Sequence, residues 1–222
     1  MAVEKVNKVK EQNVMDSSAT VKTKSTFREY AEAILMALVL ALFIRTFIVQ
    51  AFKIPSGSMI PTLQIGDHIL VNKLSYGVRI PFLERYLVDY AKPQHGDVVV
   101  FIYPEDRSKD FIKRVIGVAG DTVEIRNKKV FINGKPIEDP HANFMGYDPQ
   151  AGGVGSGDNL EAKVVPENHI FVMGDNRDRS YDSRFWGFVN LSEVRGKAFL
   201  IYWSWDGIDR WVRWERLGNL IR

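Results

Sequence analysis

Residues 96–103 read Gly-Asp-Val-Val-Val-Phe-Ile-Tyr, a turn signal followed by six β-branched or aromatic residues. Such a run is typical of a strand that begins directly after a turn. Four similar runs lie on either side of it, at His68–Val71, Lys113–Gly117, Thr122–Ile125 and Val130–Ile132. Asn133-Gly134 follows the last run and is a strong signal for a two-residue hairpin. Residues 53–222 are therefore predicted to form an all-β or strongly β-rich body.

Residues 136–168 interrupt this pattern. They contain four prolines and the glycine-rich stretch Gly152-Gly-Val-Gly-Ser-Gly157. They lack the runs of β-branched and aromatic residues that are typical of strands. We predict a flexible insert here, a small loop-rich subdomain of the body. The glycine-rich stretch is not a phosphate-binding loop, because no strand precedes it and no Lys-Ser/Thr pair follows it.

An apolar run precedes the body. Ala33 to Ile44 are twelve consecutive apolar residues, and Thr46 to Val49 extend the run past Arg45. The 17 positions from Ala33 to Val49 reach the lower limit for a hydrocarbon core of roughly 30 Å, provided that Arg45 extends its guanidinium to the headgroups. We predict one transmembrane helix over residues 30–52 and no second span.

The distribution of charge predicts the orientation of this helix. Residues 1–29 form a polar tail, predicted to be disordered, with six Lys or Arg, whereas Lys53 alone is basic among the twenty residues after Val49. The positive-inside rule therefore places the tail in the cytoplasm and residues 53–222 outside. Two alternatives stay open: a buried core helix, and a signal peptide cleaved after the small-residue pattern Val49-Gln-Ala51.

Composition excludes several classes of function. The formal net charge is +3, and from Lys53 onward 23 basic residues face 22 acidic ones, so a nucleic-acid-binding surface is not expected. The chain has no cysteine, which excludes disulfides, thiolate nucleophiles and cysteine-based metal sites. We expect neither a metal nor another cofactor. The histidines are scattered and are expected at the surface or in turns, and they are His68, His95, His141 and His169.

The segment Ile54-Pro-Ser-Gly-Ser-Met-Ile-Pro-Thr-Leu63 is the first candidate for chemistry. Prolines restrict the backbone at both ends of the segment, and Gly57 gives its middle more conformational freedom. Such a backbone can place a hydroxyl and a backbone N–H so that both point to one position. An ordinary turn is the alternative. Ser58 stands nine residues after Val49, so it lies within roughly 30 Å of the predicted end of the span.

A nucleophilic serine needs a base, and the sequence lacks the G-x-S-x-G, H-E-x-x-H and S-x-x-K signatures. A buried lysine can serve, because burial disfavours its charged form and lowers its pKa. In the run Phe111–Ile116, strand alternation places Lys113 on one face with Phe111 and Val115, so that it can point inward. A solvated lysine on an edge strand is the alternative. A Ser-His-Asp triad also stays open, although nothing local favours one.

A third segment, Met173–Arg184, is rich in hydrogen-bonding groups and lies between two apolar runs. In the frame of a calcium loop that starts at Asp178, the sixth position is not glycine, so calcium is not expected. In the functional interpretation, Ser180 hydrogen-bonds a catalytic group while Asp182 and Arg184 lock the loop. A salt-bridged structural loop is the alternative.

Taken in order, these segments resemble the type I bacterial signal peptidases. The similarity covers residues 45–134 and 170–200, and its blocks are Arg45-Thr-Phe47, Ile54–Met59, Gly66–Lys73, Gly96–Phe101, Asp110–Arg114, Gly120-Asp121 and Gly174–Arg184. The resemblance implies a mostly antiparallel β catalytic body on a membrane anchor in the bacterial plasma membrane. It also implies a serine endopeptidase that removes signal peptides from exported preproteins, cleaving after small residues at Ala-X-Ala sites. The expected partners are these preproteins and the lipid bilayer.

The resemblance assigns roles to the first two segments. Ser58 would be the nucleophile and Lys113 the general base, while the Ser56 hydroxyl and the Ser58 N–H would form the oxyanion hole. Shallow pockets would accept the small side chains at the first and third positions before the scissile bond. The residues expected to line these pockets are Ile54, Met59, Leu63, Phe111 and Ile112.

In the third segment, the resemblance makes Ser180 the group that positions the lysine and makes Asp182 and Arg184 a buried supporting pair. Two competing functions remain. A self-cleaving Ser/Lys protease related to bacterial stress-response repressors would share the dyad but would need a DNA-binding or partner domain. A membrane-anchored β module that only binds extracytoplasmic proteins would cleave nothing.

Overall fold

The computed structural model describes residues 26–79, 86–146 and 157–222, so the predicted polar tail lies outside the described residues up to position 25. The chain divides into two compact units after Leu42. The first unit contains all but the last residue of the helix α2 (Thr26–Phe43), and every described strand lies in the second. Because α2 begins at Thr26, the last four residues of the predicted tail belong to the helix.

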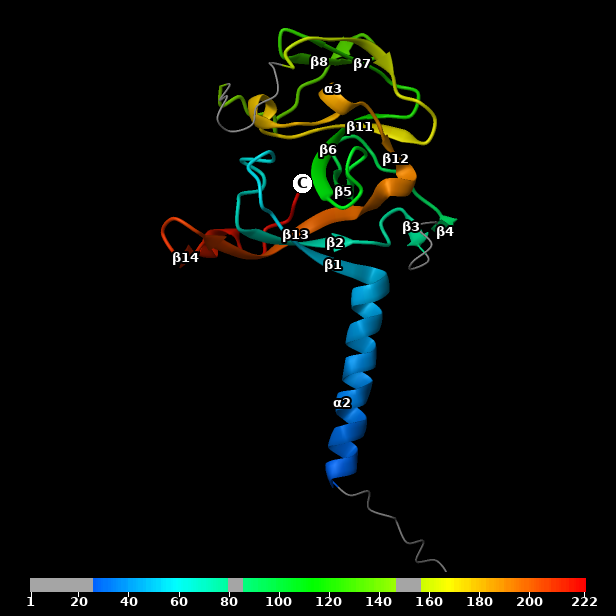
Figure 1. Ribbon diagram of the computed structural model, residues 1–222, viewed down its shortest axis with the longest axis vertical. Helices are drawn as coiled ribbons and strands as arrows, with labels where there is room; N and C mark the ends of the chain where they lie inside the picture. The colour runs from blue at the N-terminus through cyan, green and yellow to red at the C-terminus, as the bar shows by residue number, and fades with distance from the viewer. Residues whose placement is uncertain (1–25, 80–85, 147–156) are drawn as a thin grey trace, which may run out of the picture. The chain divides into compact units, whose positions relative to one another are not determined.

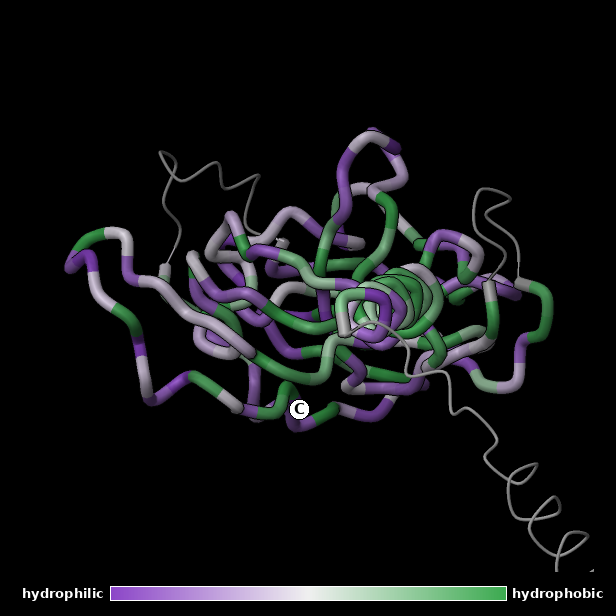
Figure 2. The backbone as a smooth tube through the Cα atoms, turned by 90° about the horizontal axis from the view of Figure 1, so that it is seen from below, coloured by the Kyte–Doolittle hydropathy of each residue, from purple (hydrophilic) through white to green (hydrophobic). Residues whose placement is uncertain are grey.

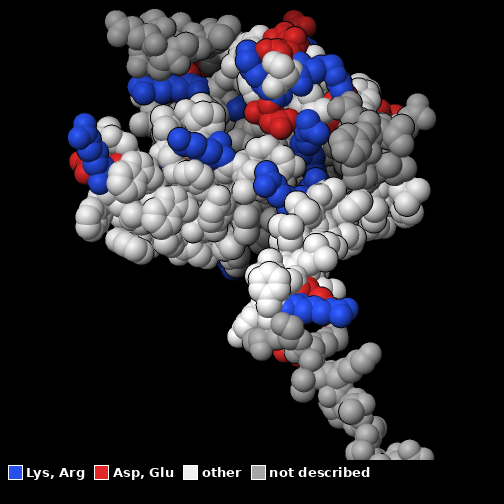
Figure 3. Space-filling model, turned by 60° about the horizontal axis from the view of Figure 1, so that its bottom comes forward, with Lys and Arg blue, Asp and Glu red and all other residues white. Residues whose placement is uncertain are grey.

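α2 is apolar on every side beyond its first two turns. Its charged residues are Arg28, Glu29 and Glu32, and Arg28 Nε lies 2.8 Å from Glu32 Oε1. Figure 2 shows the helix as mostly green, and Figure 3 shows its charged side chains gathered at one end. Its large apolar side chains are exposed, so the alternative of a buried core helix is wrong. Apolar exposure on all sides suits a lipid environment, where the helix satisfies its own backbone hydrogen bonds.

The stretch Phe27–Ile48 contains 22 residues and is long and apolar enough to cross a membrane. With a helical rise it covers about 33 Å, close to the thickness of a hydrocarbon core. Its last turn is the π-helix η1 (Ile44–Ile48), and β1 (Val49–Lys53) follows without a linker. The predicted anchor over residues 30–52 therefore ends too late, since its last residues belong to a strand that pairs with β2 (Asp67–Asn72).

The second unit is built on one antiparallel sheet of eight strands, which confirms the predicted β-rich body. The strand order is β1-β2-β13-β5-β6-β11-β12, and β14 pairs with β13 (Figure 1). The strands not yet bounded are β5 (Val98–Ile102), β6 (Asp110–Val118), β11 (His169–Met173), β12 (Val189–Asn190), β13 (Val194–Asp206) and β14 (Trp211–Val212). β6, which carries Lys113, is thus an interior strand.

A smaller sheet has the order β10-β7-β8-β9, and β3 pairs with β4 in a separate hairpin. These strands are β3 (Gly77–Arg79), β4 (Tyr86–Asp89), β7 (Thr122–Arg126), β8 (Lys129–Ile132), β9 (Lys135–Pro136) and β10 (Leu160–Val164). The predicted turn Asn133-Gly134 joins β8 to β9 with positive φ angles of 53° and 77°, which suits a type I′ hairpin.

The prediction that residues 136–168 lack strands is wrong for β10, which pairs antiparallel with β7. This strand reads Leu-Glu-Ala-Lys-Val and is mostly exposed, so it contains no apolar run that a sequence pattern could detect. The glycine-rich stretch of the insert lies largely outside the described residues.

β5 runs through the middle of the main sheet and is buried on both faces. Val98 and Val100 belong to one apolar cluster, whereas Val99 and Phe101 belong to a second. A strand covered on both sides has no polar face, which explains the uninterrupted apolar run at 98–103. The short helices of the body are α3 (Ser183–Trp186), η3 (Arg177–Arg179), η4 (Leu191–Glu193) and η5 (Trp214–Arg216).

Candidate active site

Residues 54–65, here called the serine loop, connect β1 to β2 and contain Ser58. The loop is closed at its base, since Ile54 N donates to Asp67 O at 2.8 Å and Gly66 N donates to Ile54 O at 3.0 Å. In Figure 1 it is the cyan loop that rises from β1 and β2. Its closed base fixes where the serine leaves the sheet.

Apolar side chains anchor the serine loop on the sheet. Ile54, Met59 and Leu63 are buried in the cluster that covers one face of β2, β5 and β13, and Met59 and Leu63 are 0% exposed. These three residues offer no surface to a substrate, so this burial does not support their predicted role as pocket lining. Phe111 and Ile112, predicted for the same pockets, are only half-buried. The three buried residues hold the loop over the sheet instead.

The serine loop meets β6 at the candidate dyad. Lys113 Nζ donates a hydrogen bond to Ser58 Oγ at 2.7 Å, although the two residues are 55 positions apart in the sequence. The same amine donates to Ile112 O at 3.1 Å and lies 5.3 Å from the centroid of the Phe111 ring. Lys113 is 4% exposed and Ser58 is 9% exposed. The alternative of a solvated lysine on an edge strand is therefore wrong.

The environment of Lys113 favours a neutral amine. Burial lowers the pKa of Lys113 from 10.5 to about 8. The carboxylates of Asp182 and Asp175 raise this pKa and the Arg184 guanidinium lowers it, but the loss of hydration has the largest effect. Compared with an ordinary lysine, this shift increases the neutral fraction at pH 7 by about 300-fold. The amine can therefore accept a proton near neutral pH.

The proposed oxyanion donors lie on the same loop. Ser56 is exposed, and neither its hydroxyl nor the Ser58 N–H donates to another described residue. Donors that are free and held beside a nucleophile can stabilise a developing oxyanion without giving up an existing bond. The loop thus offers both a hydroxyl and a backbone N–H for this purpose.

Ser180 lies beside the serine loop, but the predicted hydrogen bond to a catalytic group is not formed. Its Oγ is buried and has no hydrogen-bond partner among the described residues. A Cβ on Gly174 would lie 2.2 Å from Ser180 Oγ and 2.4 Å from Ser58 O. A glycine at position 174 is therefore required for Ser180 and the serine loop to approach each other.

Asp182 and Arg184 form a buried ion pair. Arg184 Nε donates to Asp182 Oδ1 at 2.8 Å and Arg184 Nη2 donates to Asp182 Oδ2 at 2.9 Å. Asp182 Oδ2 also accepts from Gly174 N at 3.0 Å, and Arg184 Nη2 also donates to Arg177 O at 2.7 Å. Both partners lie at the start of α3, and their bonds to Gly174 N and Arg177 O join α3 to the turn after β11.

Two residues that sequence reasoning missed, Arg114 and Asp175, form a second buried ion pair, with side chains 2% and 0% exposed. Arg114 Nε donates to Asp175 Oδ1 at 2.8 Å and Arg114 Nη2 to Asp175 Oδ2 at 2.7 Å. Thr62 Oγ1 donates to the same carboxylate at 2.5 Å, while Arg114 Nη1 donates to Gly96 O at 2.8 Å and Arg222 O at 3.0 Å. The pair joins β6 to the serine loop and to the turn after β11. The sequence signal that could have identified the pair is the position of Arg114 in the largely apolar run Phe111–Ile116, where a charged side chain needs a partner.

The described residues contain no group of three His, Cys, Asp or Glu side chains that could hold a metal ion. His95 and His141 lie in turns, whereas His68 and His169 are half-buried in β2 and β11. The side-chain partner of Ser58 is Lys113 and not a histidine. Ser58 is therefore not part of a Ser-His-Asp triad.

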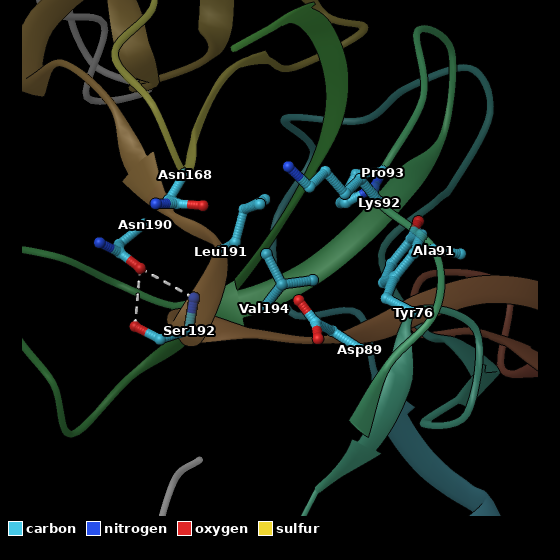
Figure 4. Close-up of a pocket in the computed structure, with 10 residues that line it drawn as sticks. All are labelled: Tyr76, Asp89, Ala91, Lys92, Pro93, Asn168, Asn190, Leu191, Ser192 and Val194. Atoms are coloured by element: carbon cyan, nitrogen blue, oxygen red, sulfur yellow. Dashed lines mark hydrogen bonds between the residues drawn. The ribbon is translucent and has the colours of Figure 1, made fainter. Parts of the chain in front are cut away.

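A hollow lies elsewhere on the body. It is lined by ten residues, and Figure 4 shows Asn190 and Ser192 on one side of it and Tyr76 and Lys92 on the other. None of the predicted site residues lines it. The hollow is therefore separate from the site of Ser58 and Lys113.

Comparisons with known proteins agree on one description. A family model described as "Signal peptidase, peptidase S26" matches residues 27–203. A signal peptidase I of Pseudomonas fluorescens is 38% identical over 211 residues, covering 80% of this chain and 72% of the relative, and one of Leptolyngbya laminosa is 36% identical, covering 82% of each. A crystal structure of a signal peptidase I from Enterococcus faecalis V583 is 32% identical with a TM-score of 0.38, covering 49% of this chain and 98% of that one.

Proposed function

The chain belongs to the signal peptidase family, peptidase S26, and is thus a serine peptidase that removes signal peptides; we propose that Ser58 is its nucleophile and Lys113 its general base. The observation that supports this assignment is the 2.7 Å hydrogen bond between Lys113 Nζ and Ser58 Oγ, made by a lysine that is 4% exposed. A hydroxyl in contact with a desolvated amine is the pair that a Ser/Lys mechanism requires.

The proposed reaction has two halves. Lys113 Nζ accepts the proton of Ser58 Oγ, and the oxygen attacks the carbonyl carbon of the scissile bond. The Ser56 hydroxyl and the Ser58 N–H donate to the oxyanion, an interaction worth on the order of 3 kcal/mol for each donor. The lysine then gives its proton to the leaving amine, and it later deprotonates the water that hydrolyses the acyl-enzyme.

The proposed cleavage site follows small residues, of the Ala-X-Ala type. Of the predicted pocket residues, Phe111 and Ile112 keep exposed surface, and both lie directly before Lys113 on β6. A substrate strand beside this part of β6 would bring its carbonyl to Ser58. No cofactor takes part in the proposed reaction.

A cleavage assay with purified full-length protein tests the function. A preprotein with an Ala-X-Ala site should yield one mature product, whose N-terminal residue is read by mass spectrometry. A self-cleaving protease would instead shorten its own chain, and a binding module would leave the preprotein intact. Either result would contradict the proposal.

The pH dependence of the reaction follows from the pKa of Lys113. Because the base is the neutral amine, kcat/KM should rise about tenfold per pH unit below pH 8 and level off above it. A pH–rate profile of the free enzyme between pH 6 and 10 measures this, with circular dichroism at each pH as the control for folding. A profile that is flat from pH 6 to 9 would contradict a lysine base.

We also propose that Phe27–Ile48 anchors the chain in the plasma membrane, with the N-terminus in the cytoplasm and the catalytic body outside. The apolar helix and the basic tail support this orientation. Cleavage of a signal peptide after Ala51 would divide β1, which pairs with β2 over all five of its residues. A retained anchor is therefore favoured over a cleaved one.

Orientation can be measured cleanly because the natural chain has no cysteine. In intact cells, a membrane-impermeant maleimide should label Ser108→Cys, which is exposed on the body, and should not label Ser17→Cys in the tail. Permeabilised cells, in which both variants should react, are the control. Labelling of Ser17→Cys alone in intact cells would reverse the proposed orientation.

A further inference from the structure

Residues 139–146, here called the strap, follow the smaller sheet's β9 and lie against the loop after β11. Asn143 N donates to Asp175 O at 2.7 Å, and Arg177 N donates to Asn143 O at 2.8 Å. The two bonds form an isolated parallel β-bridge between Asn143 and Asn176. Asp139 also pairs with Arg177, whose side chain is 3% exposed. The strap is thus fixed at its start and its middle.

One buried residue joins the strap to the serine loop. Asn176 N donates to Ser58 O at 3.1 Å, and Asn176 Nδ2 donates to Gly57 O at 3.1 Å. The same Nδ2 lies 3.6 Å from Met145 Sδ. Asn176 is 2% exposed. Asn176 therefore links the Met145 thioether to the main-chain carbonyls of Gly57 and Ser58.

The end of the strap presents two apolar side chains to solvent. Phe144 is 46% exposed and Met145 is 48% exposed. Their backbone is held in place, because Gly146 N donates to Asp178 Oδ2 at 2.8 Å and Lys128 Nζ pairs with Asp178 at 2.7 Å. Lys128 Nζ also lies 5.4 Å from the centroid of the Phe144 ring. Large apolar groups held in place at the surface are suited to contact a substrate.

We propose that Phe144 and Met145 bind the first residues of the mature protein, those directly after the scissile bond, and favour apolar side chains there. The proposal rests on the proposed function, which assigns the residues before the bond to the side of Phe111 and Ile112. A peptide whose carbonyl lies at Ser58 must continue past it in the other direction.

The reach of an extended peptide agrees with this placement. Two residues after the scissile bond extend about 7 Å from the nucleophile. Gly57 O, the carbonyl directly before Ser58, and Met145 Sδ lie 3.1 and 3.6 Å from one nitrogen of Asn176, so the thioether lies within about 7 Å of this carbonyl. A methionine side chain adapts its shape to different apolar partners, which suits an enzyme with many substrates.

The test compares two preproteins that share one signal peptide and one Ala-X-Ala site but begin the mature sequence with Leu-Leu or Ser-Ser. In the natural protein, kcat/KM should be higher for the Leu-Leu substrate. Met145→Ser and Phe144→Ser should each lower the ratio of the two kcat/KM values by about threefold to tenfold. Val164→Ser, which replaces a 62% exposed side chain on β10, is the matched control and should leave the ratio unchanged.

A charge variant gives a second and independent readout. Met145→Glu should increase kcat/KM for a substrate that begins with Lys-Lys relative to Ser-Ser, because a carboxylate attracts a nearby ammonium group. This gain does not depend on whether the serine variants lose stability.

Three results would overturn the inference: equal ratios in the natural protein and both serine variants, an altered preference before the scissile bond instead of after it, or no gain for Lys-Lys in Met145→Glu. If the natural protein cleaves none of the preproteins, the proposed function fails, and this outcome differs from all three. The proposed function and the inferred role of Phe144 and Met145 are therefore tested separately.

Discussion

Replacing Ser58 by alanine is expected to lower preprotein cleavage by about 10⁴-fold or more, and replacing Lys113 by methionine should have the same effect. The alanine variant has no oxygen to attack the scissile carbonyl. The methionine variant keeps the length and apolar stem of the buried side chain but has no amine to accept the proton. Single-turnover cleavage of a preprotein by each full-length variant measures the loss.

The two substitutions should leave the fold intact. Lys113 Nζ forms its hydrogen bonds with Ser58 Oγ and the Ile112 carbonyl, and the nearby Asp175 and Asp182 carboxylates are paired with arginines. A thioether can therefore replace the amine without leaving a charge unpaired. Lys113→Arg adds a stricter comparison, because a guanidinium is not deprotonated in proteins and should also fail as a base. Thermal unfolding of each variant is the control. Normal turnover by a folded variant would contradict the assignment of Ser58 and Lys113 as the catalytic dyad.

The second large effect is on stability, at the ion pair of Arg114 and Asp175. Asp175→Asn should lower the free energy of unfolding by about 3–5 kcal/mol, because it leaves a guanidinium buried without its counter-charge. For a body of this size the unfolding midpoint should fall by roughly 6–20 °C. Circular dichroism of the purified protein during heating measures the shift.

Two variants make this prediction specific. Asp106→Asn breaks an exposed pair with Lys109 and should leave the unfolding midpoint nearly unchanged. The double variant Arg114→Met/Asp175→Leu removes both charges and should recover much of the stability lost by Asp175→Asn. If Asp175→Asn lowers the midpoint no more than Asp106→Asn, the buried pair does not stabilise the fold as argued.

Local patterns predicted strands best where the sequence contains an uninterrupted apolar run or a clear turn signal. The run at 98–103 and the turn at Asn133-Gly134 each agree with the structure within a residue or two. The longest strand described, β13, was not predicted as one. Its pairing with β2 shifts register between Ala198 and Leu200 and again between Ile201 and Trp203, and such bulges disturb the two-residue alternation that identifies a strand.

The end of the predicted anchor shows a similar limit. Val49, Ala51 and Phe52 continue the apolar composition of the helix with Gln50 as the one polar residue among them, so composition alone did not separate them from the span. Their hydrogen bonds go to β2, which lies later in the chain. The position at which the helix ends and β1 begins therefore depends on pairing with β2, which the local sequence pattern around residue 49 does not include.

The sequence by itself determined the apolar helix, the β-rich body and the serine and lysine worth testing, because these depend on side-chain periodicity, turn chemistry and motif order. Only the tertiary structure decided that the two side chains meet. Two strands, β13 and β5, lie between β2 and β6 in the sheet, so the serine loop must cross a buried face to reach Lys113. The low pKa of the lysine and the pairing of Arg114 with Asp175 arise in the same way. Both depend on the removal of water by residues that are distant in the chain, and this is a property of packing rather than of any segment.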